Sequence, residues 1–219
     1  MNTKKSTFTF IHIPKTGGTS IRAALEPYQD RHEYKFGKHD YAKGHSPVKP
    51  IKHLLSPECI TFAVVRNTWS RVVSLYLYNE GKHHDLSSKT KEQRQESFAY
   101  WIDNNLLAGK VSLSQQQLYW LIDKDDIQQN MSQYNYSTNA TYNTDIIVDH
   151  IMKFENLAED WKKMCEIINI PHKPLTHVLQ NTLRQKEKNI VYRDWYTDHT
   201  KQCIYKHYKD TIDYFGFEF

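Results

Sequence analysis

The chain has 219 residues, of which 39% are hydrophobic and 13% aromatic, and it carries a formal net charge of +4. This length and apolar content suffice for one domain with its own core, so we expect a single domain over residues 1–219. The weak positive charge suits an anionic cofactor or an acidic glycan. It is too small to indicate a nucleic-acid partner, and no arm rich in lysine and arginine occurs.

The segment Phe8–Ser20, which reads FTFIHIPKTGGTS, predicts a strand, a tight loop and the start of a helix. Pro14 should end the strand, because proline has no N–H to donate. Gly17 and Gly18 allow positive φ and let a ligand approach the backbone closely. With the positive end of the helix dipole behind it and Lys15 at its rim, such a loop is a site for phosphate or sulfate.

The loop is not a Walker A motif, which requires G-x-x-x-x-G-K-[ST] with the lysine after the last glycine. Here Lys15 precedes both glycines, and G-K-[ST] occurs nowhere in the chain. Thr19 and Ser20 are expected to cap the helix that runs through IRAALE. Taken alone, the segment is also compatible with an ordinary turn of an α/β domain.

A second segment, Ile60–Tyr78, repeats this arrangement. The apolar run ITFAVV is typical of a buried parallel strand, and Asn67 can cap a helix that stops before Gly81. In open α/β sheets ligands bind at the carboxyl ends of the strands. Arg66 stands there and offers a forked guanidinium to an oxyanion, and Ser74, about two helical turns further on, could add a hydroxyl.

Together, HIPKTGGTS and RNTWSRVVSLY resemble the two cofactor motifs of the sulfotransferases that use 3′-phosphoadenosine-5′-phosphosulfate (PAPS). The resemblance is closest to the carbohydrate O-sulfotransferase branch, sulfotransferase family 2. It implies an α/β, P-loop-NTPase-like three-layer fold with a central parallel sheet flanked by helices. One departure is Thr68, where the family usually has proline, a residue that favours the first helical turn but supplies no ligand group.

The resemblance implies metal-free, in-line transfer of a sulfuryl group from PAPS to an acceptor hydroxyl, with adenosine 3′,5′-bisphosphate as the product. Arg66 and Ser74 would hold the 3′-phosphate, and Lys15 would also stabilise the charge on the departing phosphate. The residues expected to hold the 5′-phosphosulfate form one continuous loop: Lys15, Thr16, Gly17, Gly18, Thr19 and Ser20.

Sulfuryl transfer to a hydroxyl needs a general base, and imidazole suits this task near neutral pH. Residues 28–55 contain several histidines whose spacings fit no familiar metal site. Because related enzymes have their base in this interval, His45 is the first candidate and His39 the second, with a solvated loop histidine as the alternative for each. Glu155 is a further candidate, with a role at a helix N-terminus as the favoured alternative.

The remainder of the chain alternates polar segments with periodic ones. Residues 79–94 and 123–143 predict polar loops, while 97–107 predicts an amphipathic helix. The run IIVDHIMKFENL predicts a strand that leads into another amphipathic helix, and the strand end resembles the third conserved region of the family. In related enzymes a basic segment like 171–195 closes the nucleotide site, where Asn181 and Arg184 are candidate contacts with the cofactor.

The acceptor is open: a glycan hydroxyl is favoured, with a small metabolite, a lipid-linked glycan or a protein tyrosine as alternatives. We expect no metal site, because the three cysteines are far apart and no C-x-x-C pair occurs. No signal peptide, membrane span or Golgi-type anchor is seen, so a cytoplasmic enzyme of bacterial or phage type is expected. The competing functions are a P-loop kinase-like phosphotransferase and a PAPS-binding protein without catalysis; the oligomeric state is open.

Overall fold

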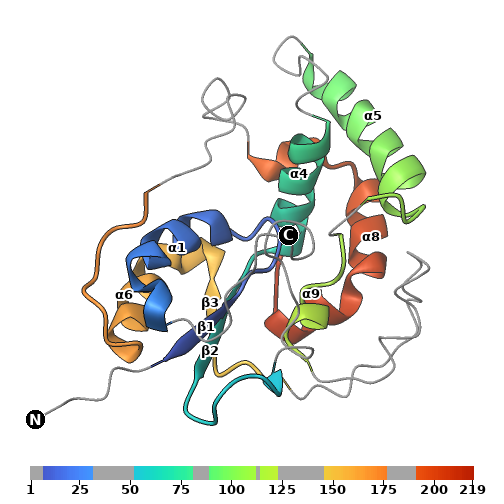
Figure 1. The fold of residues 1–219 in the computed structure, drawn as a ribbon. Helices are drawn as coiled ribbons and strands as arrows, with labels where there is room; N and C mark the ends of the chain where they lie inside the picture. The colour runs from blue at the N-terminus through green and yellow to red at the C-terminus, as the bar shows by residue number, and fades with distance from the viewer. Residues whose placement is uncertain (1–6, 32–51, 81–88, 112–113, 123–145, 177–190) are drawn as a thin grey trace, which may run out of the picture. The chain divides into compact units, whose positions relative to one another are not determined.

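The computed structural model divides the chain into two compact units, each assembled from separate segments (Figure 1). Unit 1 comprises residues 1–66, 117–124 and 144–179, and unit 2 comprises residues 67–116, 125–143 and 180–219. The structure describes residues 7–31, 52–80, 89–111, 114–122, 146–176 and 191–219. A single domain over residues 1–219 therefore stays a prediction.

Unit 1 is built on a parallel sheet of three strands in the order β1-β2-β3. Its strands are β1 (Phe8–Ile11), β2 (Ile60–Val65) and β3 (His150–Lys153). Phe10 pairs with Phe62 and Val64 with Met152 across the sheet. The central strand is buried on both faces, which explains its uninterrupted apolar sequence.

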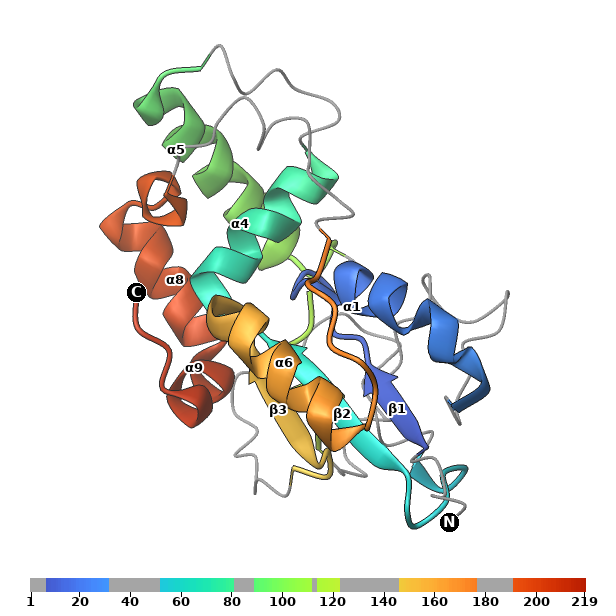
Figure 2. The same cartoon turned by 90° about the vertical axis from the view of Figure 1, so that its left-hand side faces the viewer.

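Helices α1 (Gly18–Leu25) and α6 (Leu157–Ile167) pack against one face of this sheet. Figure 2 shows α6 in front of β2 and β3 and running roughly along them, with α1 on the side of β1. The shared core includes Ile21 of α1, Trp161 of α6 and Phe62 of β2. The predicted α/β fold, with a parallel sheet flanked by helices, is confirmed.

The third strand is shorter than the predicted run IIVDHIMKFENL, because only its middle pairs with β2. Ile146 instead forms an antiparallel bridge with Ile122, and residues Phe154–Asn156 form a 3₁₀ turn, η6. The carboxylate of Asp149 accepts hydrogen bonds from the backbone N–H and the hydroxyl of Thr61, both at 2.7 Å. These bonds fix the register at which β3 begins.

Unit 2 is helical and has an aromatic core. Its elements are α4 (Thr68–Asn79), α5 (Lys91–Trp101), the π-helix η3 (Ile102–Leu106), the 3₁₀ helix η7 (Tyr192–Trp195), α8 (Asp198–His207) and α9 (Lys209–Phe215). The ring of Tyr76 makes edge contacts with Phe98, Trp101 and Trp195 at centroid distances of 5.1, 5.3 and 5.5 Å. None of the helices in the described ranges is long and apolar enough to span a membrane.

Helix α5 begins within the segment that was expected to be a polar loop, so that expectation is wrong for residues 91–94. Thr90 and Gln93 form a capping box in which each side chain bonds to the backbone N–H of the other. This reciprocal capping offsets the low hydrophobicity of the first turn.

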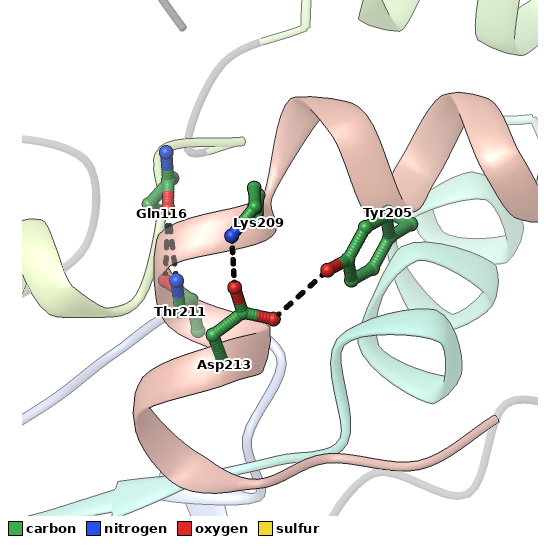
Figure 3. Close-up of polar contacts among 5 residues, drawn as sticks. All are labelled: Gln116, Tyr205, Lys209, Thr211 and Asp213. Carbon is green, nitrogen blue, oxygen red and sulfur yellow. Dashed lines mark hydrogen bonds and ion pairs between the residues drawn. The ribbon is translucent and has the colours of Figure 1, made fainter. Parts of the chain in front are cut away.

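Helix α9 is fixed at its start by a buried contact and on its surface by an ion pair (Figure 3). Gln116 accepts hydrogen bonds from the backbone N–H and the hydroxyl of Thr211, at 3.2 and 3.1 Å. Lys209 forms an exposed ion pair with Asp213, which also accepts a hydrogen bond from the hydroxyl of Tyr205 at 3.2 Å. The buried contact ties α9 to residues 114–116 and is the more important of the two, because exposed ion pairs contribute little.

The start of α4 suggests a stabilising substitution. Thr68 is the first helical residue and is 1% exposed, and its hydroxyl has no hydrogen-bond partner among the described residues. The preceding Asn67 has φ −43° and ψ 124°, and this ψ lies in the extended range that a following proline favours. Proline at this helical position loses no helix hydrogen bond.

We therefore expect Thr68→Pro to raise the free energy of unfolding by about 0.4–1 kcal/mol, because proline lowers the conformational entropy of the unfolded chain. Loss of the buried hydroxyl adds to this gain. Urea denaturation measures the change, and Thr68→Ala, which removes only the hydroxyl, separates the two contributions. Destabilisation by Thr68→Pro beyond that of Thr68→Ala would contradict the argument.

Candidate active site

The loop after β1 turns sharply because two of its residues have positive φ. Lys15 has φ 68° and Gly17 has φ 90°. Glycine adopts this conformation freely, but a lysine does so at an energetic cost, and such strain occurs often at functional sites. Thr16 is fully buried between them, and its hydroxyl donates to the carbonyl of Ile13 at 2.9 Å. The side chain of Thr16 therefore stabilises the shape of the loop.

Gly18 is required because the ring of His12 occupies the space beside it. A Cβ atom at Gly18 would lie 2.1 Å from Cδ2 and 2.3 Å from Nε2 of His12. A Cβ atom at Gly17 would lie 3.0 Å from the ring of Phe154. His12 is 5% exposed and stacks on Phe10, with ring centroids 5.6 Å apart. The two glycines thus let the loop pack directly on two aromatic rings.

The first turn of α1 is capped differently from the prediction. The N-cap residue is Gly17, which provides no side-chain cap, and the helix begins at Gly18. Thr19 and Ser20 lie inside the helix, and the N–H of Ser20 bonds to the carbonyl of Gly17 at 3.1 Å. The prediction that Thr19 and Ser20 cap the helix is therefore wrong, because the N-cap is Gly17, two residues before Thr19, where the positive φ of the glycine starts the helix.

Arg66 follows β2 directly, is 4% exposed and reaches this loop. Its Nη1 donates to the carbonyl of Lys15 at 3.3 Å, and its guanidinium carbon lies 4.3 Å from the ring centroid of Phe154. Phe154 belongs to η6, which follows β3. The segments after all three strands of the sheet therefore meet at their carboxyl ends, around one guanidinium and one strained loop.

The backbone of Arg66 is held by the side chain of Gln117, which is 1% exposed. The amide oxygen of Gln117 accepts from the N–H of Arg66 at 2.8 Å, and its amide nitrogen donates to the carbonyl of Arg66 at 2.7 Å. One side chain thus makes both hydrogen bonds that a neighbouring strand would supply. This pairing fixes the point from which the Arg66 side chain extends.

A sulfotransferase family model matches residues 1–218. The chain belongs to the sulfotransferase family. The family predicted from the two motifs is thereby confirmed, together with the P-loop-like α/β fold, and the general chemistry of the family is sulfuryl transfer. A search of curated proteins found no match for the chain.

The second arginine of the sulfotransferase motif RNTWSRVVSLY has a structural role within unit 2. Arg71 is fully buried, and its Nη1 donates to the carbonyl of Gln115 at 2.9 Å. Burial lowers the pKa of Arg71 to about 10 and raises that of the neighbouring Tyr208 to about 12. Tyr208 donates to the carbonyl of Ser114 at 2.7 Å, so both side chains hold the same short segment. Asn67 accepts from the N–H of Ser70 at 3.2 Å, which confirms the predicted N-cap of α4.

The remaining predicted sulfotransferase residues are distributed over the chain. Ser74 is half-buried on α4 in unit 2, and Glu155 is exposed on η6 in unit 1, next to Phe154. Four predicted residues lie outside the described residues: His39, His45, Asn181 and Arg184. Within the described ranges, no cluster of metal-ligating side chains lies at the loop.

Two residues that shape the loop were not predicted. Gln117 stands in a run of three glutamines, and nothing local distinguishes the one that pairs with Arg66. His12 precedes the loop directly, but its contact with Gly18 depends on how the strand and helix pack. In both cases the contact is a tertiary one.

Gly18→Ala tests the packing of the loop on His12. Overpacking of this kind costs about 1–3 kcal/mol, so we expect the free energy of unfolding to fall by that amount. In a His12→Ala background the same change should cost much less, because the ring is gone. Chemical denaturation of the four proteins measures the coupling, and equal costs in both backgrounds would contradict the contact.

Proposed function

We propose that the chain transfers a sulfuryl group from PAPS to a hydroxyl of a carbohydrate acceptor, without a metal ion. The observation that carries the proposal is the contact between Arg66 and the loop, with Nη1 of Arg66 3.3 Å from the carbonyl of Lys15. PAPS bears anionic groups at both its 5′ and 3′ positions. A nucleotide of this kind needs two cationic or amide-rich sites at a fixed separation, which the loop and Arg66 can provide.

The 5′-phosphosulfate would be held by the loop and the first turn of α1. Backbone N–H groups at a helix N-terminus bind anions, and the absence of acidic residues in the first turn of α1 leaves the positive end of its dipole unopposed there. Lys15 would stabilise the negative charge that develops as the sulfuryl group leaves the 5′-phosphate. The loss of one such preorganised group typically costs about 10²–10³ in rate.

The 3′-phosphate would be held by Arg66 and Ser74, and this contact would distinguish PAPS from ATP. A guanidinium makes paired, charge-assisted hydrogen bonds to phosphate. Phe154 and Gln117 restrict the side chain and the backbone of Arg66, so less conformational freedom is lost when a phosphate binds.

The acceptor hydroxyl would lose its proton to a histidine. His45 is the first candidate and His39 the second, and Glu155 is a further one. Asn181 and Arg184 would contact the cofactor from the C-terminal connector. A carbohydrate acceptor is favoured by the resemblance to the carbohydrate branch of the family.

Calorimetric titration with adenosine 3′,5′-bisphosphate in a metal-free buffer tests the cofactor. We expect tight binding of the bisphosphate and much weaker binding of ATP, with or without Mg²⁺. Turnover is then measured with labelled PAPS over a panel of glycans. Binding of ATP in preference to the bisphosphate would overturn the proposal in favour of a kinase-like activity, and binding without turnover of any acceptor would favour a non-catalytic protein.

Arg66→Ala should weaken the binding of adenosine 3′,5′-bisphosphate about 10- to 150-fold, because a charge-assisted hydrogen bond contributes about 1.5–3 kcal/mol. The affinity for adenosine 5′-phosphosulfate, which has no 3′-phosphate, should change little. Arg22→Ala removes an exposed arginine of α1 and serves as the matched control. If Arg66→Ala bound the bisphosphate as the wild type does, the role of Arg66 would be wrong.

Gln117→Met keeps the side-chain length but removes both hydrogen bonds to Arg66. We expect a smaller loss of affinity for the bisphosphate than with Arg66→Ala, and no further loss when the two changes are combined. This non-additivity is the signature of a residue that acts through another one. Additive losses would show instead that Gln117 contacts the nucleotide or supports the fold generally.

His45→Ala should reduce the turnover of PAPS by about 10²–10⁴-fold while leaving the affinity for the bisphosphate unchanged, because a general base acts on the acceptor alone. His39→Ala is the matched variant in the same segment. If His39→Ala removed turnover and His45→Ala did not, the two assignments would be exchanged.

A further inference from the structure

Unit 2 contains a cluster of three potential metal ligands that sulfuryl transfer does not use: Asp103, His199 and Cys203. One ligand atom from each of these side chains lies within 4.8 Å of the other two. Asp103 and His199 are exposed and Cys203 is half-exposed, so an ion in solution can reach all three. Among the described residues this is the one group of its kind.

The spacing of the sulfur and nitrogen atoms matches that of two ligands on one tetrahedral ion. Sγ of Cys203 lies 3.5 Å from Nε2 of His199. Bond lengths of about 2.3 Å for Zn–S and 2.0–2.1 Å for Zn–N at a tetrahedral angle give a separation of about 3.6 Å. A carboxylate oxygen of Asp103 lies within 4.8 Å of both atoms, and because the Asp103 side chain is exposed it can rotate to supply a third corner.

The secondary structure explains why these residues meet. His199 and Cys203 are four residues apart on α8, which places them on the same face of that helix. Asp103 lies in η3, the π-helical continuation of α5. A π-helical turn shifts the following side chains around the helix axis, and such turns occur often at functional sites.

Charge supports a cation at this place. In the parts of unit 2 that the structure describes, Lys91 pairs with Asp194 at 3.4 Å and Lys209 pairs with Asp213. No ion pair or hydrogen bond in these parts involves the Asp103 carboxylate. Carboxylate, imidazole and thiolate together are a ligand set that suits Zn²⁺ and related ions rather than Mg²⁺ or Ca²⁺.

We propose that Asp103, His199 and Cys203 bind one divalent transition-metal ion of the zinc class, with the fourth position taken by water. Binding replaces the thiol proton of Cys203, which is released to the solvent. The ion would join η3 to α8 and stabilise unit 2 by mass action. This site is independent of the proposed sulfuryl transfer, which needs no metal.

Titration of the metal-free protein with Zn²⁺, in a buffer with a phosphine reductant that keeps Cys203 reduced, tests the proposal. We expect one ion per chain, a rise in the thermal unfolding temperature and an affinity that falls as the pH is lowered, because protons compete for the thiolate and the imidazole. Titration with Co²⁺ should produce a thiolate-to-cobalt charge-transfer absorption, which reports directly on sulfur ligation.

Cys203→Ser should abolish this absorption, while Asp103→Asn and His199→Ala should each weaken Zn²⁺ binding by at least about 10-fold, since even hydrogen-bond partners of metal ligands contribute that much. Asp198→Asn removes the exposed acid that precedes His199, and His172→Ala removes an exposed histidine of unit 1; neither change should alter either measurement.

A missing absorption, an absorption that persists in Cys203→Ser, or unchanged affinity in both Asp103→Asn and His199→Ala would overturn the proposal. The unfolding temperatures of the metal-free variants show whether each one is folded. Binding of adenosine 3′,5′-bisphosphate is measured on the same samples and reports on the other site independently.

Discussion

The geometry of the candidate site depends on where the Arg66 backbone is held at the end of β2. Gln117 makes two hydrogen bonds to that backbone, and the guanidinium then reaches the carbonyl of Lys15 while resting on Phe154. A buried guanidinium is costly unless its N–H groups find partners, so these contacts also stabilise the unligated protein. The same interactions that keep the arginine inside unit 1 therefore keep it directed at the loop.

The loop contributes a second constraint, because its conformation is set by packing and not by flexibility. Thr16 is turned inward, and the two glycines lie against the rings of His12 and Phe154. A rigid loop with its N–H groups already oriented binds an anion without first being ordered. The positive φ of Lys15 is the energetic cost of that arrangement, and the rest of unit 1 must offset it.

The sequence predicted those strands, caps and turns that depend only on neighbouring residues. The strand ITFAVV, the N-cap Asn67 and the tight glycine turn between β1 and α1 follow from short-range rules of burial, capping and glycine placement. The capping box of Thr90 and Gln93 follows the same kind of short-range rule, although the polar composition of the segment favours a loop. Contacts such as Gln117 with Arg66, or Asp103 with Cys203, join residues far apart in the chain. No spacing rule reveals them, which is why cysteine spacing alone argued against a metal site.

The inward-facing hydroxyl of Thr16 has a consequence for how the rate should depend on acidity. With that side chain occupied, the loop can offer an anion its backbone N–H groups, the ammonium of Lys15 and the hydroxyls of Thr19 and Ser20. Neither amide N–H groups nor guanidinium groups change protonation near neutral pH. The hold of the loop on the 5′-phosphosulfate is then insensitive to acidity over the range in which imidazole titrates. The second pKa of a phosphate monoester is about 6, so a kinetic inflection in that range would belong to the 3′-phosphate or to the acceptor side of the reaction.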